Sequence, residues 1–344
     1  MTALEQDLRS IGDAVEVLPH DAPRDVWLAA RAAGIGGSDA STVAGVNPWS
    51  SRYELWLDKT GRLPEREQTN AMRLGHALEP VLRQLFLEEE GIDVELVGLL
   101  RNTTRPWQQV SLDGLTSDGG VFEAKTTSWR MADEWDDDQV SDHAEIQVQH
   151  AMAVTGLPHA WVAFLVDGRD FGFRKVLRDD HLIAQITAME DAFWHSHVLT
   201  DVQPALEPNA LGAVKDRWQQ LTPDQVLDVP GPQILPLLDE LDVAKAACKI
   251  ADANRDRIEA QVIDLIADLE AIAVGGVIVA TRKANGTFAA KRFEQAHPDL
   301  AATYRKDIEV LDVERIKTEH PDLYSQHRAR VLRPAKKRRT DHHG

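Results

Sequence analysis

The chain has 344 residues, a formal net charge of −18 and a hydrophobic fraction of 43%. This length allows one large or two modest globular domains, and the acidic balance argues against indiscriminate binding of polyanions. The one cysteine, Cys248, excludes an intrachain disulfide and a metal centre built from several cysteines of this chain. There is no membrane-length apolar run and no signal-peptide layout, so we expect a cytoplasmic protein that does not bind a membrane.

The N-terminal part predicts a phosphate-binding turn. Residues 1–23 are expected to be an irregular lead-in, and a short helix begins at Arg24. A glycine-rich turn, residues 34–37, then leads into a second short helix, whose free N–H groups would suit an anion. Ser38 would add a hydroxyl and Arg31 a bidentate positive charge. The alternative is that the turn only connects two helices, as most such turns do.

A longer amphipathic helix is predicted over residues 70–90. Its apolar residues recur at spacings of three and four, which indicates packing on a sheet: Met72, Leu78, Val81, Leu82, Leu85 and Phe86. Glu79 lies among them. Its carboxylate either reaches the surface or points inward as a metal ligand, and the pattern leaves both options open.

The segment 111–126 carries the strongest chemical signal. Its Asp-Gly pairs, beginning at Asp113 and Asp118, are strong turn formers, and a strand after them places Glu123 and Lys125 on one face. The turn would return Asp113 to these two side chains. Two acids beside a lysine are typical of nucleases that hold a hard divalent cation, although an ordinary ion pair next to an ordinary turn is the alternative.

The next elements complete an α/β (α+β) pattern. An acid-rich loop at residues 133–138 is followed by a helix over residues 144–155, a hairpin around Asp167-Gly168 and a helix over residues 180–197. The buried side of that last helix is expected to hold Ile183, Ile186, Met189, Phe193 and Trp194. Helices alternating with strands in this order predict a mixed central β-sheet covered by helices on both sides.

The C-terminal part is expected to be mainly helical. After a proline-rich linker, residues 204–236, apolar spacing between residues 241 and 272 predicts coiled-coil-like packing within a region spanning residues 237–333. A hairpin is expected across Asn285-Gly286. Two His-Pro-Asp-Leu repeats predict two short helices, whose histidines are interpreted as structural. The basic tail, residues 334–344, is either solvated or in contact with DNA.

Five short motifs occur in a characteristic order along the chain: Ile35-Gly36-Gly37-Ser38-Asp39, Gly75-His76-Ala77-Leu78-Glu79-Pro80, Ser111-Leu112-Asp113-Gly114, Glu123-Ala124-Lys125 and Gln147-Val148-Gln149-His150-Ala151-Met152. With them, residues 24–200 resemble the YqaJ-type viral recombinase (phage lambda exonuclease) family. The resemblance implies a PD-(D/E)xK nuclease domain, placed at residues 24–203. It also implies a Mg²⁺-dependent (or Mn²⁺-dependent) 5′–3′ exonuclease that acts on linear double-stranded DNA ends and leaves 3′ single strands for phage-type recombination.

The resemblance also assigns roles to single residues. It implies that Asp113, Glu123 and Glu79 bind metal, that Lys125 is the catalytic lysine, that Gln147 lies near the active site, and that Arg31 and Ser38 surround the 5′ phosphate. The chain departs from the family at Ala144, where an aromatic residue is often found; His143 stands beside it.

The resemblance further implies a trimeric ring around DNA, a single-strand annealing protein as partner, and a phage or prophage gene in a bacterial host. Two other functions stay open. One is a non-catalytic DNA-end-binding or recombination scaffold module. The other is a related endonuclease; a Cas4-like protein would carry a cysteine cluster, which this chain lacks.

Overall fold

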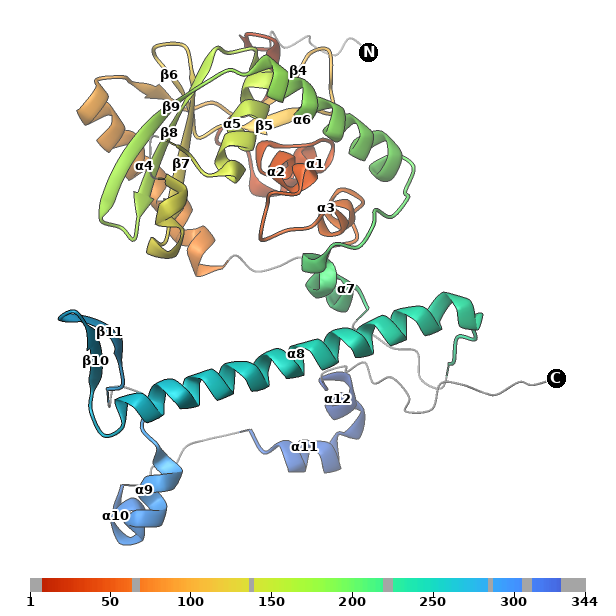
Figure 1. Cartoon of the computed structure of the whole chain (residues 1–344). Helices are drawn as coiled ribbons and strands as arrows, with labels where there is room; N and C mark the ends of the chain where they lie inside the picture. Colours follow the sequence, from red (N-terminus) through yellow and green to blue (C-terminus); the bar gives the residue numbers. More distant parts are fainter. Residues whose placement is uncertain are drawn as a thin grey trace. The chain divides into compact units, whose positions relative to one another are not determined.

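A computed structural model of the chain describes residues 8–63, 69–135, 139–218, 225–283, 287–304 and 311–328. The chain divides into two compact units, residues 1–219 and 220–344. Figure 1 shows their elements, and each unit is described by itself below.

The first unit is built on a five-stranded mixed sheet with the order β3-β6-β7-β8-β9. Its strands are β3 (Val94–Glu95), β6 (Gly114–Thr116), β7 (Val121–Thr127), β8 (His159–Val166) and β9 (Asp170–Leu177). Strands β7 and β8 run parallel, whereas the other neighbours are antiparallel. The predicted hairpins around Asp118-Gly119 and Asp167-Gly168 are therefore confirmed.

A second, four-stranded antiparallel sheet has the order β1-β2-β4-β5. Its strands are β1 (Ser10–Ile11), β2 (Ala14–Leu18), β4 (Leu99–Asn102) and β5 (Gln109–Ser111). The prediction of an irregular lead-in is wrong here, because Gly12, at φ +54°, and Asp13 close a tight hairpin between β1 and β2. Residues 94–102 hold two strands in different sheets, β3 and β4. They separate at Gly98, where a Cβ would meet the Leu18 carbonyl oxygen at 1.8 Å.

Helices cover the five-stranded sheet on both faces (Figure 1). Helix α5 packs on one face and helix α4 on the other. The helices of the unit are α1 (Arg24–Ala32), α2 (Gly37–Ala44), α3 (Arg52–Lys59), α4 (Asn70–Glu90), α5 (Asp142–Thr155), α6 (Asp180–Phe193) and α7 (Leu211–Arg217), with short 3-10 segments at Trp129–Trp135 and Pro208–Ala210 and a π turn at Trp194–Val198. Val121 and Val162 lie in the core that α5 covers. Phe122 and Ala163 pack with Leu82 and Phe86 of α4 on the other face. This alternation along the strands confirms the predicted mixed α/β fold.

Two predictions about the end of the first unit need correction. On α6, Met189 is 38% exposed and Glu190 is fully buried, because Glu190 has hydrogen-bonding partners inside the core. The predicted linker begins too early. Ala210 and Ala213 are buried in the same cluster as Tyr53, so α7 belongs to the first unit.

The second unit contains α8 (Gly231–Ile266), the hairpin of β10 (Ala271–Val274) and β11 (Val277–Thr281), and the short helices α9 (Ala290–Ala296), α10 (Pro298–Thr303), α11 (Val313–Glu319) and α12 (Pro321–Gln326). The two repeat helices are as predicted. The long helix differs in its bounds: it begins at Gly231, inside the predicted linker, and ends at Ile266, before the predicted spacing ends at residue 272, where β10 has begun. The predicted hairpin is wrong, because β11 turns back onto β10 through Gly275 and Gly276, which both have positive φ. Asn285-Gly286, Asp136 to Asp138 and the tail at residues 334–344 lie outside the described residues. No described helix is long and apolar enough to cross a membrane.

Candidate functional site

Asp113 is held against strand β7 by the backbone. It lies between β5 and β6, where the chain passes from one sheet to the other, and its Oδ2 accepts a hydrogen bond of 2.8 Å from the Ala124 N–H. Ala124 stands between Glu123 and Lys125 on β7. The turn therefore returns Asp113 to the two side chains that the sequence predicts as its neighbours.

Glu123, Lys125 and Gln147 form a closed triangle of hydrogen bonds. The Lys125 Nζ donates to Glu123 Oε1 at 2.6 Å and to Gln147 Oε1 at 2.7 Å, and Gln147 Nε2 donates to Glu123 Oε1 at 2.6 Å. Helix α5 supplies Gln147 and strand β7 supplies the other two residues. Because the amide uses both of its ends, it fixes the lysine and the carboxylate in one geometry.

Burial raises the pKa of Asp113 well above its usual range, and the nearby negative charges of Glu123 and Glu79 raise it further. The Ala124 N–H and Lys125 oppose this shift only in part. Glu79 comes from helix α4, where its Oε1 lies 2.9 Å from the His76 Nδ1. The fold thus gathers excess negative charge around Asp113 from a turn, a strand and a helix.

The negative charge around Asp113 raises the question of whether these side chains could bind a metal ion. Within the described ranges, no group of three or more His, Cys, Asp or Glu side chains is arranged to hold a metal. The Glu123 carboxylate contacts Lys125 and Gln147, and Glu79 contacts His76. The donors at hand are nevertheless carboxylate oxygens beside the partly buried Asp113, and this chemistry fits a hard divalent cation.

The glycine-rich turn carries Arg31 and Ser38 side by side. The guanidinium of Arg31 donates to Ser38 Oγ at 2.8 Å and to Asp39 Oδ1 at 3.3 Å. Ser38 is exposed near the start of α2, whereas Asp39 is buried. The predicted pairing of a guanidinium with a hydroxyl at a helix N-terminus is therefore present, although Asp39 shares the charge of Arg31.

Asp39 organises this turn, and the sequence did not single it out. Its carboxylate accepts from the Gly36 N–H at 2.9 Å and lies 2.6 Å from the Nζ of Lys59, whose side chain is fully buried. Burial alone would raise the pKa of Asp39, but the charges of Lys59 and Arg31 outweigh it and hold that pKa well below its usual range. The available signal was an acid three residues after Gly36, which is the spacing of a helix cap.

The turn and the triangle are in contact. A Cβ built on Gly37 would lie 3.1 Å from the Cγ of Gln147. The Ile35 N–H also donates to the Trp107 carbonyl at 2.7 Å, and the Gln109 N–H donates back to the Ile35 carbonyl at 2.9 Å. The glycine-rich turn and the triangle therefore share one wall.

A buried network behind that wall was also missed by sequence reasoning. His150 lies between the Glu190 carboxylate, 2.6 Å from its Nδ1, and the Gln109 carbonyl, 2.9 Å from its Nε2. Gln108 donates to the other oxygen of Glu190 at 2.6 Å. Polar residues on a helix usually face solvent, so the spacing of Gln147 and His150 did not predict that His150 is buried. The only signal was that His150 belongs to the motif that begins at Gln147.

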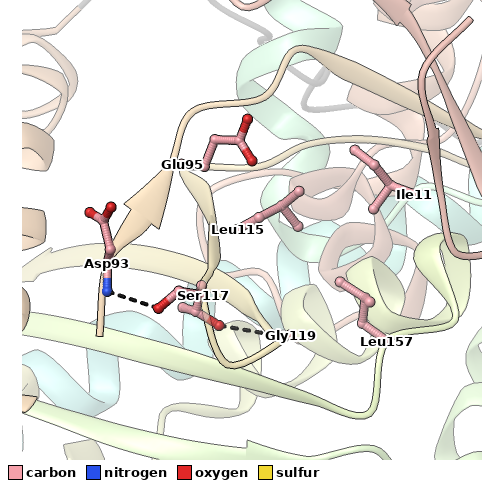
Figure 2. A pocket seen from close by; sticks show the side chains of 9 residues that line it. Ile11, Asp93, Glu95, Leu115, Ser117, Gly119 and Leu157 are labelled. Carbon is pink, nitrogen blue, oxygen red and sulfur yellow. Dashed lines mark hydrogen bonds between the residues drawn. The ribbon is translucent and has the colours of Figure 1, made fainter. Parts of the chain in front are cut away.

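A cavity of about 440 Å³ lies elsewhere on the first unit, at the tip of the β6–β7 hairpin (Figure 2). Asp93, Leu115 and Ser117 are among its lining residues, and the Asp93 N–H donates to Ser117 Oγ at 3.1 Å. None of the seven site residues predicted from the sequence lines it. This cavity is therefore separate from the candidate site.

Comparison with solved structures gives partial matches. An alkaline exonuclease from Laribacter hongkongensis is 26% identical, with 52% of this chain and 94% of that chain covered and a TM-score of 0.44. A phage-related exonuclease from Haemophilus somnus 129PT is 14% identical, with 49% and 96% covered and a TM-score of 0.38.

Comparison at the sequence level gives the family. The family profile described as YqaJ-like viral recombinase domain matches residues 26–158. The uncharacterized protein YqaJ of Bacillus subtilis (strain 168) is 34% identical over 213 residues, which cover 60% of this chain and 67% of that protein. The chain belongs to the YqaJ-like viral recombinase family.

Proposed function

We propose that this protein is a metal-dependent DNA exonuclease that removes nucleotides from the 5′ ends of linear duplex DNA and leaves 3′ single strands. One observation carries the proposal: the Glu123–Lys125–Gln147 triangle adjoins both the partly buried Asp113 and the turn of Arg31 and Ser38. Membership in the YqaJ-like viral recombinase family supports the proposal.

In the proposed reaction, Asp113 and Glu123 would hold Mg²⁺ or Mn²⁺, and Glu79 would complete the carboxylate set. When bound, the ion would lower the pKa of a water and polarise the scissile phosphate. Lys125 orients or deprotonates the attacking water, or offsets the charge that develops on the phosphate. Gln147 holds Lys125 and Glu123 in register for this task.

The turn of Arg31 and Ser38 is the feature that favours an exonuclease over an endonuclease in this proposal. A guanidinium and a hydroxyl at a helix N-terminus suit a terminal phosphate dianion. Because the turn packs on Gln147, a 5′ phosphate bound there would set how far the strand reaches into the site. Cutting would then begin at DNA ends.

The test uses 5′-labelled linear duplex and a closed circle, each incubated with Mg²⁺ or with EDTA. We expect nucleotide release from linear DNA with Mg²⁺ only, and release lowered by roughly 10²-fold or more in Lys125→Ala and Asp113→Asn proteins. If the wild type releases no nucleotides, the protein is not an exonuclease, and the alternative of a non-catalytic DNA-end-binding module is favoured. Equal cutting of the circle rejects the exonuclease in favour of an endonuclease.

A comparison of DNA ends tests the turn separately. A 5′-phosphate end should be degraded faster than a 5′-hydroxyl end by the wild type, and Arg31→Ala should remove most of this difference. Equal rates with both ends in the wild type would contradict the assigned roles of Arg31 and Ser38.

The proposal includes the setting of the reaction. We place it in the cytoplasm of a bacterial host, with a single-strand annealing protein as partner and a trimeric ring as the assembly. Light scattering at working concentration tests the ring, and a monomer contradicts it. Pull-down of a co-expressed annealing protein tests the partnership.

A further inference from the structure

An exposed tryptophan stands beside the site and has no role in the reaction described above. The ring of Trp49 is 63% exposed and packs edge-on against His143, with ring centroids 5.2 Å apart at 78°. Trp49 follows α2, and His143 lies in the first turn of α5. We call these two rings the Trp49–His143 shelf.

The shelf adjoins the reacting groups. His143 precedes Gln147 by one helical turn on α5, so both side chains lie on the same face of that helix. Burial lowers the pKa of His143, and the positive charge of Lys125 lowers it further, which agrees with this placement. The His143 imidazole is accordingly neutral at neutral pH, and a neutral ring suits contact with an uncharged aromatic partner.

The loop that presents Trp49 is fixed in advance. The side chain of Asn47 accepts from the Trp49 N–H and donates to Thr42 Oγ1, each at 2.9 Å. The next carbonyl, of Ser50, accepts from the Asn209 side chain at 3.0 Å. An exposed aromatic on a braced loop loses little conformational entropy when a ligand covers it.

The shelf opens into a cavity of about 330 Å³. Val46, Pro48, Met131 and Val140 are among the residues that line it together with the two rings. The His143 Nδ1 is buried and has no hydrogen-bond partner among the residues that the structure describes. The rest of the lining is polar: Glu134, Gln139, Ser141 and Asp142. An exposed aromatic face with apolar side chains and an unpartnered ring nitrogen beside it suits the stacking of a planar heterocycle.

We propose that the Trp49–His143 shelf is a nucleobase-binding subsite that stacks the base of the 5′-terminal nucleotide of the strand being cut. This inference rests on the proposed exonuclease function. The terminal nucleotide lies between the 5′ phosphate, assigned to Arg31 and Ser38, and the scissile phosphate, assigned to Asp113 and Glu123. Gln147 touches both of these places, and the shelf lies one helical turn from it. Stacking on Trp49 needs an unpaired base, so the subsite would hold the terminal pair open.

The first experiment measures release of the terminal nucleotide under single-turnover conditions with Mg²⁺. Trp49→Ala should raise the DNA concentration for half-maximal rate by roughly 5- to 100-fold, the range expected for loss of one base stack. Trp49→Phe should stay within about 3-fold of the wild type, because the aromatic face remains. Trp218→Ala is the matched control, since Trp218 is 60% exposed and does not line the cavity. If Trp49→Ala leaves the DNA concentration for half-maximal rate unchanged, the proposal is overturned.

The second experiment uses a duplex whose 5′-terminal nucleotide is abasic. The wild type should bind it as weakly as Trp49→Ala binds normal DNA, and the abasic end should add no further loss in Trp49→Ala. If the two losses add, Trp49 does not contact that base and the subsite is rejected. If Trp49→Ala instead loses only its capture of another protein, the shelf is a protein-docking surface and the subsite is again rejected.

Binding in EDTA separates this inference from the proposed function. Anisotropy of a labelled 5′-phosphorylated duplex with a frayed end reports the stack without hydrolysis. A wild type that binds but never cuts, with binding weakened by Trp49→Ala, keeps the subsite and rejects the exonuclease. A wild type that cuts, with binding and rates unaffected by Trp49→Ala, keeps the exonuclease and rejects the subsite.

Discussion

Gly37 lies against Gln147 so closely that a Cβ on Gly37 would stand 3.1 Å from the Cγ of Gln147. Gly37 of α2 therefore contacts Gln147 of α5 through its Cα hydrogen, at the place where any other residue would have a Cβ. This contact sets the separation between the turn that is assigned to the 5′ phosphate and the triangle that is assigned to hydrolysis.

Gly37→Ala should displace Gln147 by a few tenths of an ångström. We expect nucleotide release to slow by roughly 3- to 30-fold, since misplacement by about 1 Å costs on the order of 10²-fold. Gly212→Ala is the control, because a Cβ on Gly212 in α7 meets nothing within 4 Å. A Gly37→Ala protein as active as the Gly212→Ala protein would show that Gln147 moves freely.

Gln147→Leu removes two hydrogen bonds from the triangle while it keeps the size of the side chain. The rate of the chemical step should fall by roughly 10- to 10³-fold, with the melting temperature nearly unchanged. Single-turnover kinetics and thermal unfolding measure the two quantities. Gln84→Leu provides the comparison, since Gln84 also bonds a glutamate on a helix but lies on the exposed face of α4. If the chemical step is equally fast in both variants, Gln147 has no role in the reaction.

Asp39→Asn should destabilise the first unit, because the buried ammonium of Lys59 loses its nearest carboxylate, at 2.6 Å, and keeps only that of Asp58, at 3.9 Å. We expect a loss of about 3–5 kcal/mol in the free energy of unfolding, measured in urea. Asp252→Asn breaks an exposed pair with Arg255 and should have no measurable effect. Since the native pKa of Asp39 is lowered, its contribution is present above the unfolded pKa and is lost only as the pH falls into the strongly acidic range.

For His150 we predict a loss of folding stability at alkaline pH. Burial alone would lower its pKa, but the Glu190 carboxylate and the two hydrogen bonds outweigh burial and raise it above the usual 6.5. Both ring nitrogens face oxygen acceptors, so both carry hydrogen and the imidazolium is charged. Its stabilisation is complete below pH about 6.5 and is lost as the pH rises through the native pKa, at up to about 1.4 kcal/mol per pH unit.

Thermal unfolding between pH 6 and pH 9 checks this expectation. The His150→Gln protein should lack the His150-dependent decline, whereas His181→Gln, at an exposed position of α6, should keep it. A wild type whose stability rises through this pH range, with His150→Gln unchanged in slope, would contradict the assignment of a charged imidazolium.

The end of the first unit gives a prediction about shortened chains. A chain that ends at residue 219 should unfold as cooperatively as the first unit of the full protein. A chain that ends at residue 203 loses the buried Ala210 and Ala213 and the Arg217 guanidinium over Trp56. It should be less stable by about 2–3 kcal/mol in urea. If the two chains are equally stable, the domain ends at residue 203, as the sequence predicted.

The sequence predicted long helices and tight hairpins well, because both depend on local pattern. Helix α4 has the predicted bounds, and Asp113, Glu123 and Lys125 meet because Asp-Gly turns and strand alternation act over a few residues. The same local logic failed at residues 277–281, where two turns competed and Gly275-Gly276 closed the hairpin.

Long-range polar partners could not be predicted from spacing. Lys59 meets Asp39 and Glu190 meets His150 only after α3 and α6 have docked, and nothing in their local patterns marks them as buried. The position of Gln147 came from family resemblance. Its double hydrogen bond gives the physical reason that spacing alone did not supply.

The parallel bridge between Ile35 and Gln108 joins segments far apart in the chain. Gln109, the next residue, accepts from His150 through its carbonyl, and its side chain donates to the Arg31 carbonyl at 2.7 Å. Opening any one of these contacts exposes the others to water. The start of α2 and the middle of α5 should therefore exchange their amide hydrogens together, as one cooperative folding unit, and lose their protection in a single step under mild denaturant.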